Sequence, residues 1–241
     1  MKTYQYRIYP TKRQEADLFY ILRVARHWYN MCIEERKVAW ELEKRSVSKS
    51  QQQANIKHYK RTFLSKKQVH THVLQIVMLD VHKAYQSFFR RIKSGETAGY
   101  PRFKGYKRFH SFGFAEYGNG FKIDGRRLRI SNVGRVRVRW HRPIEGKVKT
   151  ARIIHKAGHW YVSFACEIED KAALKKTGRE LGLDMGINAL ITTSDGIRVD
   201  NPKWYRDAQD RLRFLQRRLA RSKHGSNQRK KKLRAVQRWH E

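Results

Sequence analysis

The spacing of apolar residues changes near residue 96, and this change restricts the fold more than any other feature of the chain. Before it, Val73, Val77 and Val81 recur at the spacing of an amphipathic helix. After it, Val136 and Val138 alternate with arginines, which is the period of a β-strand. We therefore expect an α+β protein of more than one domain.

The first hundred residues predict one strand followed by three helices. Residues 3–9 alternate as a strand does, and Pro10 ends it. Thr11 and Gln14 have the spacing of a capping box, which predicts a helix from there to about residue 45. Two further helices are expected over residues 51–64 and 69–92. Together they suggest a helical unit inserted after the first strand.

Residues 99–169 predict several short strands that together form a barrel. A hairpin is expected to turn at Asp124-Gly125, and another at Ala157-Gly158. Between them, residues 133–140 alternate valine with arginine. Short strands with regular turns favour a β-barrel, to which the strand at 3–9 could add.

A third pattern begins after a basic linker at residues 171–179. Short strands are expected at 180–186, 188–193 and 197–199, with a turn at 194–196. Beyond Pro202, two basic helices are expected, separated at Gly225-Ser226.

Positive charge dominates the composition: 55 Lys and Arg face 21 Asp and Glu, which gives a formal net charge of +34. Such a chain gains most from a polyanion, because each neutralised phosphate releases counterions. A membrane surface also attracts basic chains, but no long apolar run or signal peptide is present, so we expect a cytoplasmic protein without a membrane role. Cys32 and Cys166 are expected to be buried thiols, and they support neither a disulfide framework nor a zinc site.

Several segments are candidates for nucleic-acid binding. Residues 99–109 alternate cations with aromatic rings, which suits phosphate binding together with base stacking, although the rings could also pack on the barrel. The arginines of the Val-Arg strand share one face, for which solvation is the alternative. The candidate nucleic-acid-binding residues are Arg7, Gln75, Tyr100, Arg102, Phe103, Lys104, Lys107, Arg108, Arg135, Arg137, Arg139, Arg217, Arg218 and Arg221.

Asp184 is the candidate for metal chemistry. It lies in the middle of an expected strand, between Gly182 and Gly186, with its side chain opposite an apolar face. A carboxylate in that position could bind Mg²⁺ and a phosphate, as in two-metal nucleases. An exposed aspartate on an edge strand is the alternative. Asp195, Asp200, Asp207 and Asp210 are better explained as turn, cap or ion-paired residues, so no second ligand is identified.

Five segments resemble, in order, the TnpB family of insertion-sequence proteins, which are relatives of the compact type V CRISPR nucleases. They are residues 6–14 (YRIYPTKRQ), 84–89 (AYQSFF), 99–104 (GYPRFK), 158–163 (GHWYVS) and 182–187 (GLDMGI). The resemblance spans essentially the whole chain. It implies a wedge-type, OB-like barrel interrupted by a helical recognition domain and followed by the start of a RuvC-like nuclease domain of ribonuclease H type.

The implied boundaries are 1–10 for the first strand of the barrel, 11–95 for the recognition domain, 96–172 for the rest of the barrel, and 173–241 for the RuvC-like part. Asp184 falls on the family's first catalytic aspartate, a ligand of Mg²⁺. Gln75 is similar in position to a residue that reads a short motif beside the DNA target, and Thr71 stands where some relatives have Lys. The family's other catalytic acids and its zinc ribbon do not occur in these 241 residues.

The resemblance implies an RNA-guided, transposon-associated DNA endonuclease that binds a transposon-derived guide RNA and double-stranded DNA. We expect binding by this chain, but no cleavage by it alone, because its nuclease site is incomplete. The alternative is a nuclease-inactive, RNA-guided transcriptional repressor. A DNA-joining transposase lacks support, because no tyrosine or histidine pair is arranged for strand transfer.

Overall fold

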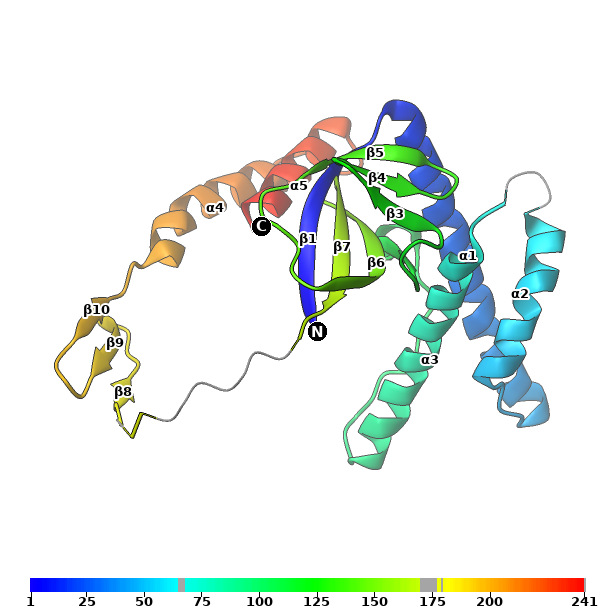
Figure 1. The fold of residues 1–241 in the computed structure, drawn as a ribbon, viewed down its shortest axis with the longest axis horizontal. Helices are drawn as coiled ribbons and strands as arrows, with labels where there is room; N and C mark the ends of the chain where they lie inside the picture. The colour runs from blue at the N-terminus through cyan, green and yellow to red at the C-terminus, as the bar shows by residue number, and fades with distance from the viewer. Residues whose placement is uncertain (65–67, 170–176, 179, 241) are drawn as a thin grey trace. The chain divides into compact units, whose positions relative to one another are not determined.

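The computed structural model describes residues 1–64, 68–169, 177, 178 and 180–240. The chain forms two compact units, Met1–Glu169 and the part from residue 170 onward (Figure 1). Most of the linker expected at 171–179, including the boundary expected at residue 172, lies outside the described residues. No helix in the described parts is long and apolar enough to cross a membrane.

A seven-stranded antiparallel sheet forms the β part of the first unit, in the order β2-β6-β7-β1-β5-β4-β3. β1 lies in the middle and pairs with β7 on one side and with β5 on the other. The sheet curls but does not close, because β2 and β3 are its edges. The expected barrel is therefore an open, curled sheet. The strands are β1 (Lys2–Tyr9), β2 (Ser111–Phe114), β3 (Phe121–Asp124), β4 (Arg127–Ile130), β5 (Gly134–Arg139), β6 (Lys147–Lys156) and β7 (His159–Glu167).

Both expected hairpins are confirmed. β3 and β4 turn after Asp124, and β6 and β7 turn at Ala157 and Gly158. Ala157 and Gly158 both have positive φ, 49° and 81°. Positive φ at both central residues is typical of the tight turns whose twist matches that of the flanking strands.

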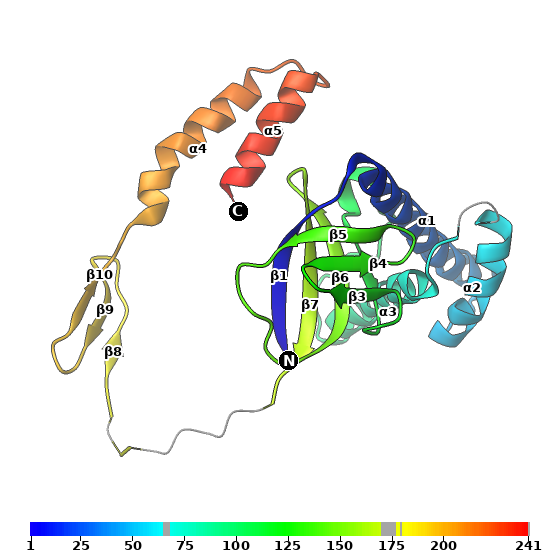
Figure 2. The same ribbon diagram turned by 45° about the horizontal axis from the view of Figure 1, so that its top comes forward.

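Three helices lie together on one side of this sheet in both views (Figure 1, Figure 2). They are α1 (Lys12–Glu43), α2 (Lys49–Phe63) and α3 (Thr71–Lys93). The capping box of Thr11 and Gln14 is present at the start of α1, and a second one, formed by Ser48 and Gln51, starts α2. Each satisfies backbone N–H groups that a helix start leaves without partners. The expected helical unit after the first strand is confirmed.

One hydrophobic core joins the helices to the sheet. Tyr4, Tyr6 and Ile8 of β1 point into it, and Trp28 of α1 and Val77 of α3 contribute from the helices. Burying a large apolar side chain contributes about 1.5–3 kcal/mol, so this shared core is the main force holding the first unit together.

Two polar contacts fix the angle of the helices on the sheet. Asp80 of α3 accepts two hydrogen bonds from the Arg152 guanidinium of β6, both 2.9 Å long. Glu15 of α1 accepts a hydrogen bond of 3.1 Å from the Trp160 indole of β7. A bidentate arginine–carboxylate pair is directional, so it defines the register between helix and strand as well as stabilising it.

The second unit contains a small antiparallel sheet and two helices. The sheet has the order β10-β9-β8, with β8 (Leu183–Asp184), β9 (Ala189–Thr193) and β10 (Arg198–Asp200). It is followed by α4 (Trp204–Ala220) and α5 (Asn227–Trp239). Arg229 at the start of α5 donates hydrogen bonds to the backbone carbonyls of Leu219 and Ser222, which closes the helical hairpin.

Candidate nucleic-acid interface

The outer face of the curled sheet carries a continuous set of cations. Strand alternation directs Tyr6 and Ile8 inward and Arg7 and Tyr9 outward. On β5, Val136 and Val138 are buried, while the arginines that alternate with them are exposed, as the sequence predicted. The strand register therefore builds one surface, which we call the arginine face: Arg7, Tyr9, Arg127, Arg129, Arg135, Arg137, Arg139 and Tyr161.

Three pairs of arginines lie opposite each other across two strand pairings of this surface. Arg7 lies opposite Arg139, and on the neighbouring pair of strands β4 and β5 the partners are Arg127 with Arg137 and Arg129 with Arg135. Like charges directly opposite in a sheet are destabilising. A carboxylate offsets part of this, because Asp124 pairs with Arg135 at 2.6 Å. A bound polyanion would relieve the rest.

Aromatic rings are interleaved with these arginines. The guanidinium of Arg7 lies 5.0 Å from the centre of the Tyr9 ring, and that of Arg137 lies 5.8 Å from the same ring. Arg7 also donates a 2.9 Å hydrogen bond to Nδ1 of His159. A depression of about 420 Å³ beside them is lined by Gln5, Arg7, Arg139, His141 and Tyr161. Cations with exposed ring faces suit phosphates and bases together.

Arg127, Arg129, Tyr9 and Tyr161 are members of the arginine face that sequence reasoning missed. The alternation of residues 127–130, Arg-Leu-Arg-Ile, signals two outward arginines. What the sequence does not signal is that β4 lies beside β5, or that β7 brings Tyr161 opposite Arg7.

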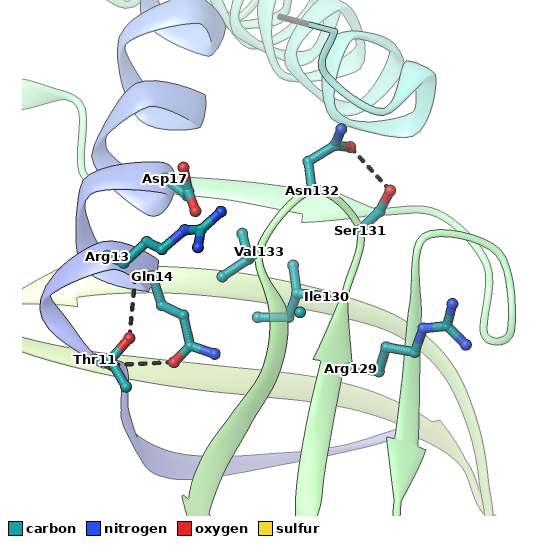
Figure 3. A pocket seen from close by; sticks show the side chains of 10 residues that line it. Thr11, Arg13, Gln14, Asp17, Arg129, Ile130, Ser131, Asn132 and Val133 are labelled. Atoms are coloured by element: carbon teal, nitrogen blue, oxygen red, sulfur yellow. Dashed lines mark hydrogen bonds between the residues drawn. The ribbon is translucent and has the colours of Figure 1, made fainter.

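A pocket of about 540 Å³ lies where the start of α1 meets the loop between β4 and β5 (Figure 3). Arg13 and Arg129 contribute cations, and Asp17 a carboxylate. Both polar atoms of the Gln14 side chain make hydrogen bonds within the protein. The side chain accepts from the backbone N–H of Thr11 and donates to the carbonyl of Arg135. The hydrogen bond from Gln14 therefore connects the start of α1 to β5, which carries part of the arginine face.

Gln75 lies in a groove between α2 and α3. The groove is about 420 Å³ in volume, and its lining includes Gln53, Lys57, Lys60 and Thr71. The Lys60 ammonium donates to the Thr71 hydroxyl over 3.1 Å. The sequence placed Gln75 on a polar helix face, and the structure adds two lysines and a second glutamine from the neighbouring helix. Amides with lysines beside them can contact base edges and phosphates respectively.

The basic-aromatic segment divides into exposed and packed residues. Arg102, Phe103, Lys107 and Arg108 are exposed. Tyr100 is 41% exposed as well, and its hydroxyl forms a 3.0 Å hydrogen bond with that of Tyr85.

Lys104 is packed rather than exposed. It is half-buried, with its ammonium 4.3 Å from the centre of the Tyr29 ring. Asn30 makes hydrogen bonds with both backbone groups of Lys104. Burial lowers the pKa of Lys104.

The candidate arginines of the second unit are exposed on and after α4. Arg217 and Arg218 lie in the last turn of the helix, and Arg221 caps its C-terminus. The guanidinium of Arg218 lies 5.4 Å from the centre of the Phe214 ring. Cations at this end also interact favourably with the helix dipole.

Asp184 is exposed on β8, the edge strand of the small sheet. Its register partner is Thr192, which in turn lies opposite Arg198. The expected apolar face beside it is exposed too: Leu183 is 62% exposed and Met185 74%.

The described residues do not form a metal centre around Asp184. Among them, no three His, Cys, Asp or Glu residues gather closely enough to hold an ion. The carboxylate of Asp195 accepts from Thr193 in the turn between β9 and β10, Asp200 pairs with Arg198, and Asp210 pairs with Arg213. The donor set that the structure describes therefore does not fit two Mg²⁺ ions.

Comparison with known proteins places the chain in a family. A family model described as "Probable transposase" matches residues 163–241, and one described as "Helix-turn-helix domain" matches residues 1–45. In this structure residues 1–45 form β1 and the single long helix α1.

Curated relatives extend the match over the whole chain. A "Putative RNA-guided DNA endonuclease" of Streptomyces pristinaespiralis is 34% identical, over 99% of this chain and 59% of that protein. The "Putative RNA-guided DNA endonuclease InsQ" of Escherichia coli (strain K12) is 34% identical over 69% of this chain and 40% of that protein. The chain thus spans about half the length of these relatives. It belongs to the TnpB family, the OrfB-type proteins of insertion sequences.

Two solved structures have low overall similarity to the chain. A Cas12f1–sgRNA–target DNA complex is 9% identical, with a TM-score of 0.39 over 90% of this chain and 62% of the other. A CRISPR-Cas12f ternary complex is also 9% identical, with a TM-score of 0.45 over 89% and 55%.

Proposed function

We propose that this chain is the nucleic-acid-binding part of an RNA-guided, transposon-associated DNA endonuclease. It holds a transposon-derived guide RNA and a double-stranded DNA target that carries a short flanking motif. The observation that carries the proposal is the arginine face, where three arginine pairs lie opposite each other across neighbouring strands. The names of the curated relatives support the reaction class.

The arginine face is the proposed site for the guide RNA. Its opposed arginines raise the free energy of the isolated sheet, and closely spaced phosphates lower it again. Tyr9 and Tyr161 supply ring faces for unstacked bases, which RNA loops offer and duplex DNA does not. Curvature of the sheet suits a backbone that wraps around it.

The groove between α2 and α3 is the proposed reader of the DNA motif. Gln75 contacts a base edge there, and Lys57 and Lys60 contact the phosphates on either side. In this assignment the sheet and the helices form the wedge and recognition domains, with boundaries at 1–10, 11–95 and 96–172.

The second unit is proposed as the first part of a RuvC-like nuclease domain. Support comes from the antiparallel order β8-β9-β10 followed by a helix, with Asp184 on the first strand. Asp184 would be one Mg²⁺ ligand among several, and Mg²⁺ would supply charge stabilisation for phosphate chemistry. Because the described residues gather no further ligands around it, we assign binding rather than cutting to them.

Sequencing of RNA that co-purifies with the chain tests the proposal. The protein is expressed together with an insertion sequence of this family, purified at moderate salt, and its bound RNA sequenced. We expect one RNA species derived from that element. Recovery of random cellular RNA would refute a guide, while leaving non-specific polyanion binding in place.

A plasmid assay tests the assignment of binding without cutting. The purified chain with its RNA is incubated with a matching plasmid and Mg²⁺, alongside the Asp184→Ala variant. We expect the plasmid to be bound and to stay uncut by both proteins. Cutting that Asp184→Ala abolishes would overturn this assignment.

A further inference from the structure

An aromatic cavity lies at the end of the helical bundle, outside the arginine face and the α2–α3 groove. It is about 420 Å³ in volume and opens where the last turns of α1 and α3 meet the segment before residue 101. Five rings line it: Trp40, Tyr85, Phe88, Phe89 and Tyr100. We call it the aromatic pocket. Its volume is within the range of small-molecule sites, which is about 300–1,000 Å³.

Three of these rings hold one another by edge-to-face packing. Tyr100 lies 5.6 Å from Tyr85 and 5.3 Å from Phe88, with interplanar angles of 87° and 78°. The hydrogen bond between the hydroxyls of Tyr85 and Tyr100 adds a further restraint. Trp40 and Phe89 keep 53% and 60% of their surfaces exposed. The exposed faces of these two rings, one from each helix, can stack on a flat ligand.

Arg36 gives the pocket a polar component. Its guanidinium lies 4.9 Å from the centre of the Tyr85 ring, and its Nε donates 2.9 Å to the side-chain carbonyl of Gln52. Its Nη2 is buried and has no hydrogen-bond partner. Burial lowers the pKa of Arg36. A buried guanidinium with an unsatisfied donor gains free energy from a ligand that brings an acceptor.

The chemistry of the lining selects one class of ligand. A flat ring that stacks on Trp40 or Phe89 and carries acceptors in its own plane satisfies both the rings and Arg36. Nucleobases have this combination, with carbonyl and ring-nitrogen acceptors at their edges. None of the described residues that line the pocket is acidic, and Arg45 lies at it as a second cation, with its Nε paired to Glu43. An apolar helix would leave the Arg36 donor unsatisfied.

We propose that the aromatic pocket binds an unstacked nucleobase from a single-stranded segment of RNA or DNA. The inference rests on the proposed function, in which the chain holds nucleic acid, and adds a site outside the arginine face and the α2–α3 groove. The base stacks on Trp40 or Phe89 and accepts from Arg36, which turns its Nη2 toward the ligand. The phosphates beside that base remain in solvent near Arg45.

Affinity for strands with and without bases tests this proposal. The full 241-residue chain is titrated with a short mixed-sequence RNA, with DNA of the same sequence, and with an abasic strand of equal length. The variant is Trp40→Ala/Phe89→Ala, and Leu42→Ala, at an exposed residue on the same end of α1, is the control. Because base stacking on aromatic rings contributes about 1–3 kcal/mol per base, we expect the double variant to lose between about five-fold and about a hundred-fold in affinity.

The expected loss is confined to strands that carry bases. The abasic strand should bind the double variant and the original protein equally, and Leu42→Ala should change neither affinity. Loss on RNA, on DNA or on both supports the proposal and identifies the source of the base.

Three results would overturn it. One is unchanged affinity of the double variant for both base-carrying strands, and another is an equal loss on the abasic strand. The third is a shift of sedimentation from dimer to monomer without loss of affinity, which would assign the pocket to a second copy. If the unsubstituted chain bound no strand at all, the proposed function would fail with it, whereas failure of the pocket alone leaves RNA binding by the unsubstituted chain intact.

Discussion

Side-chain direction on single strands determines what the sheet can bind. Alternation on β1 buries Tyr6 and Ile8 and exposes Arg7, and the same rule on β5 exposes Arg137 and Arg139. These directions follow from the period of the strand and were predicted from the sequence. The opposition of Arg7 and Arg139 was not, because register between strands distant in sequence depends on the whole sheet.

Lys104 and Lys107 are neighbouring cations with different environments, which gives a paired prediction. Lys104 packs on Tyr29, whereas Lys107 is exposed. Lys104→Ala should therefore lower the free energy of unfolding by about 1 kcal/mol, since it removes the side-chain stem that packs beside Tyr29 and Phe109, and leave the salt dependence of RNA binding unchanged.

Lys107→Ala should change the salt dependence rather than the stability. We expect unchanged stability and a salt slope that is smaller by about 0.7, the value for one single-strand phosphate contact. Urea unfolding and titrations at several salt concentrations measure the two quantities. Equal effects of both substitutions on the salt slope would contradict the assignment.

His70 makes stability depend on pH. Its Nδ1 accepts a 3.2 Å hydrogen bond from the backbone N–H of His72, which caps the start of α3. Burial lowers the pKa of His70 below its ordinary 6.5, and the charges of His72 and Lys60 lower it further, against the raising effect of the Asn119 hydrogen bond. The neutral ring is therefore favoured in the folded state.

His70 is expected to destabilise the protein at acidic pH. Above pH 6.5 it makes its full contribution to the free energy of unfolding, and this contribution is lost as the pH falls through the lowered pKa of the folded state. We expect the urea midpoint to decrease between about pH 7.5 and about pH 5. His70→Asn keeps a capping side chain without a titrating ring, so part of the decrease should disappear. The rest comes from His82, whose pKa is lowered mainly by burial. An unchanged pH profile in His70→Asn would count against the cap.

At the level of elements, the start of α1 connects the helices to the arginine face. Thr11 accepts from the backbone N–H of Gln14 (Figure 3). The Gln14 side chain donates to the carbonyl of Arg135 on β5. Thr11→Ala should lower the free energy of unfolding by about 1 kcal/mol, because it leaves a helix N–H without its partner. Thr11→Ser keeps the hydroxyl and should remain close to the original in urea unfolding. A similar loss in both variants would show that the methyl group, not the cap, matters.

The groove between α2 and α3 gives a prediction about discrimination rather than affinity. If Gln75 reads a base edge, Gln75→Ala should reduce the preference for the flanking motif by about 1–3 kcal/mol. Lys57→Met should weaken binding to all sequences alike, because a phosphate contact carries no sequence information. Competition between duplexes with and without the motif separates the two. A uniform loss in Gln75→Ala would remove it from motif reading.

Long elements were easier to predict than short ones. The three helices of the first unit and the two hairpins follow from periodicity, caps and turn residues. β2, with four residues, was missed, because Ser111–Phe114 is too short for a period to be visible and pairs with the distant β6. The strand expected at 180–186 proved to be two residues long, since the register with β9 extends over Leu183 and Asp184 alone.

For the whole molecule, charge and family resemblance predicted more than any local pattern did. The net charge of +34 indicated a polyanion partner, and the order of motifs indicated the TnpB family, which the comparisons confirm. The expected barrel is present as an open, curled sheet, because β2 and β3 remain edges and closure depends on pairing that alternation does not specify. The aromatic pocket was invisible in the sequence, because Trp40, Phe89 and Tyr100 meet only after α1 and α3 pack.

The salt dependence of RNA binding tests the central claim, that the arginine face holds the RNA. The affinity of the chain for its co-purifying RNA is measured against salt concentration, together with that of Arg7→Gln/Arg137→Gln/Arg139→Gln. Each lost contact to a single-stranded phosphate reduces the slope of the logarithmic plot by about 0.7, so the triple variant should have a slope smaller by about 2. An unchanged slope, with weaker or equal binding, would place the RNA elsewhere on the protein.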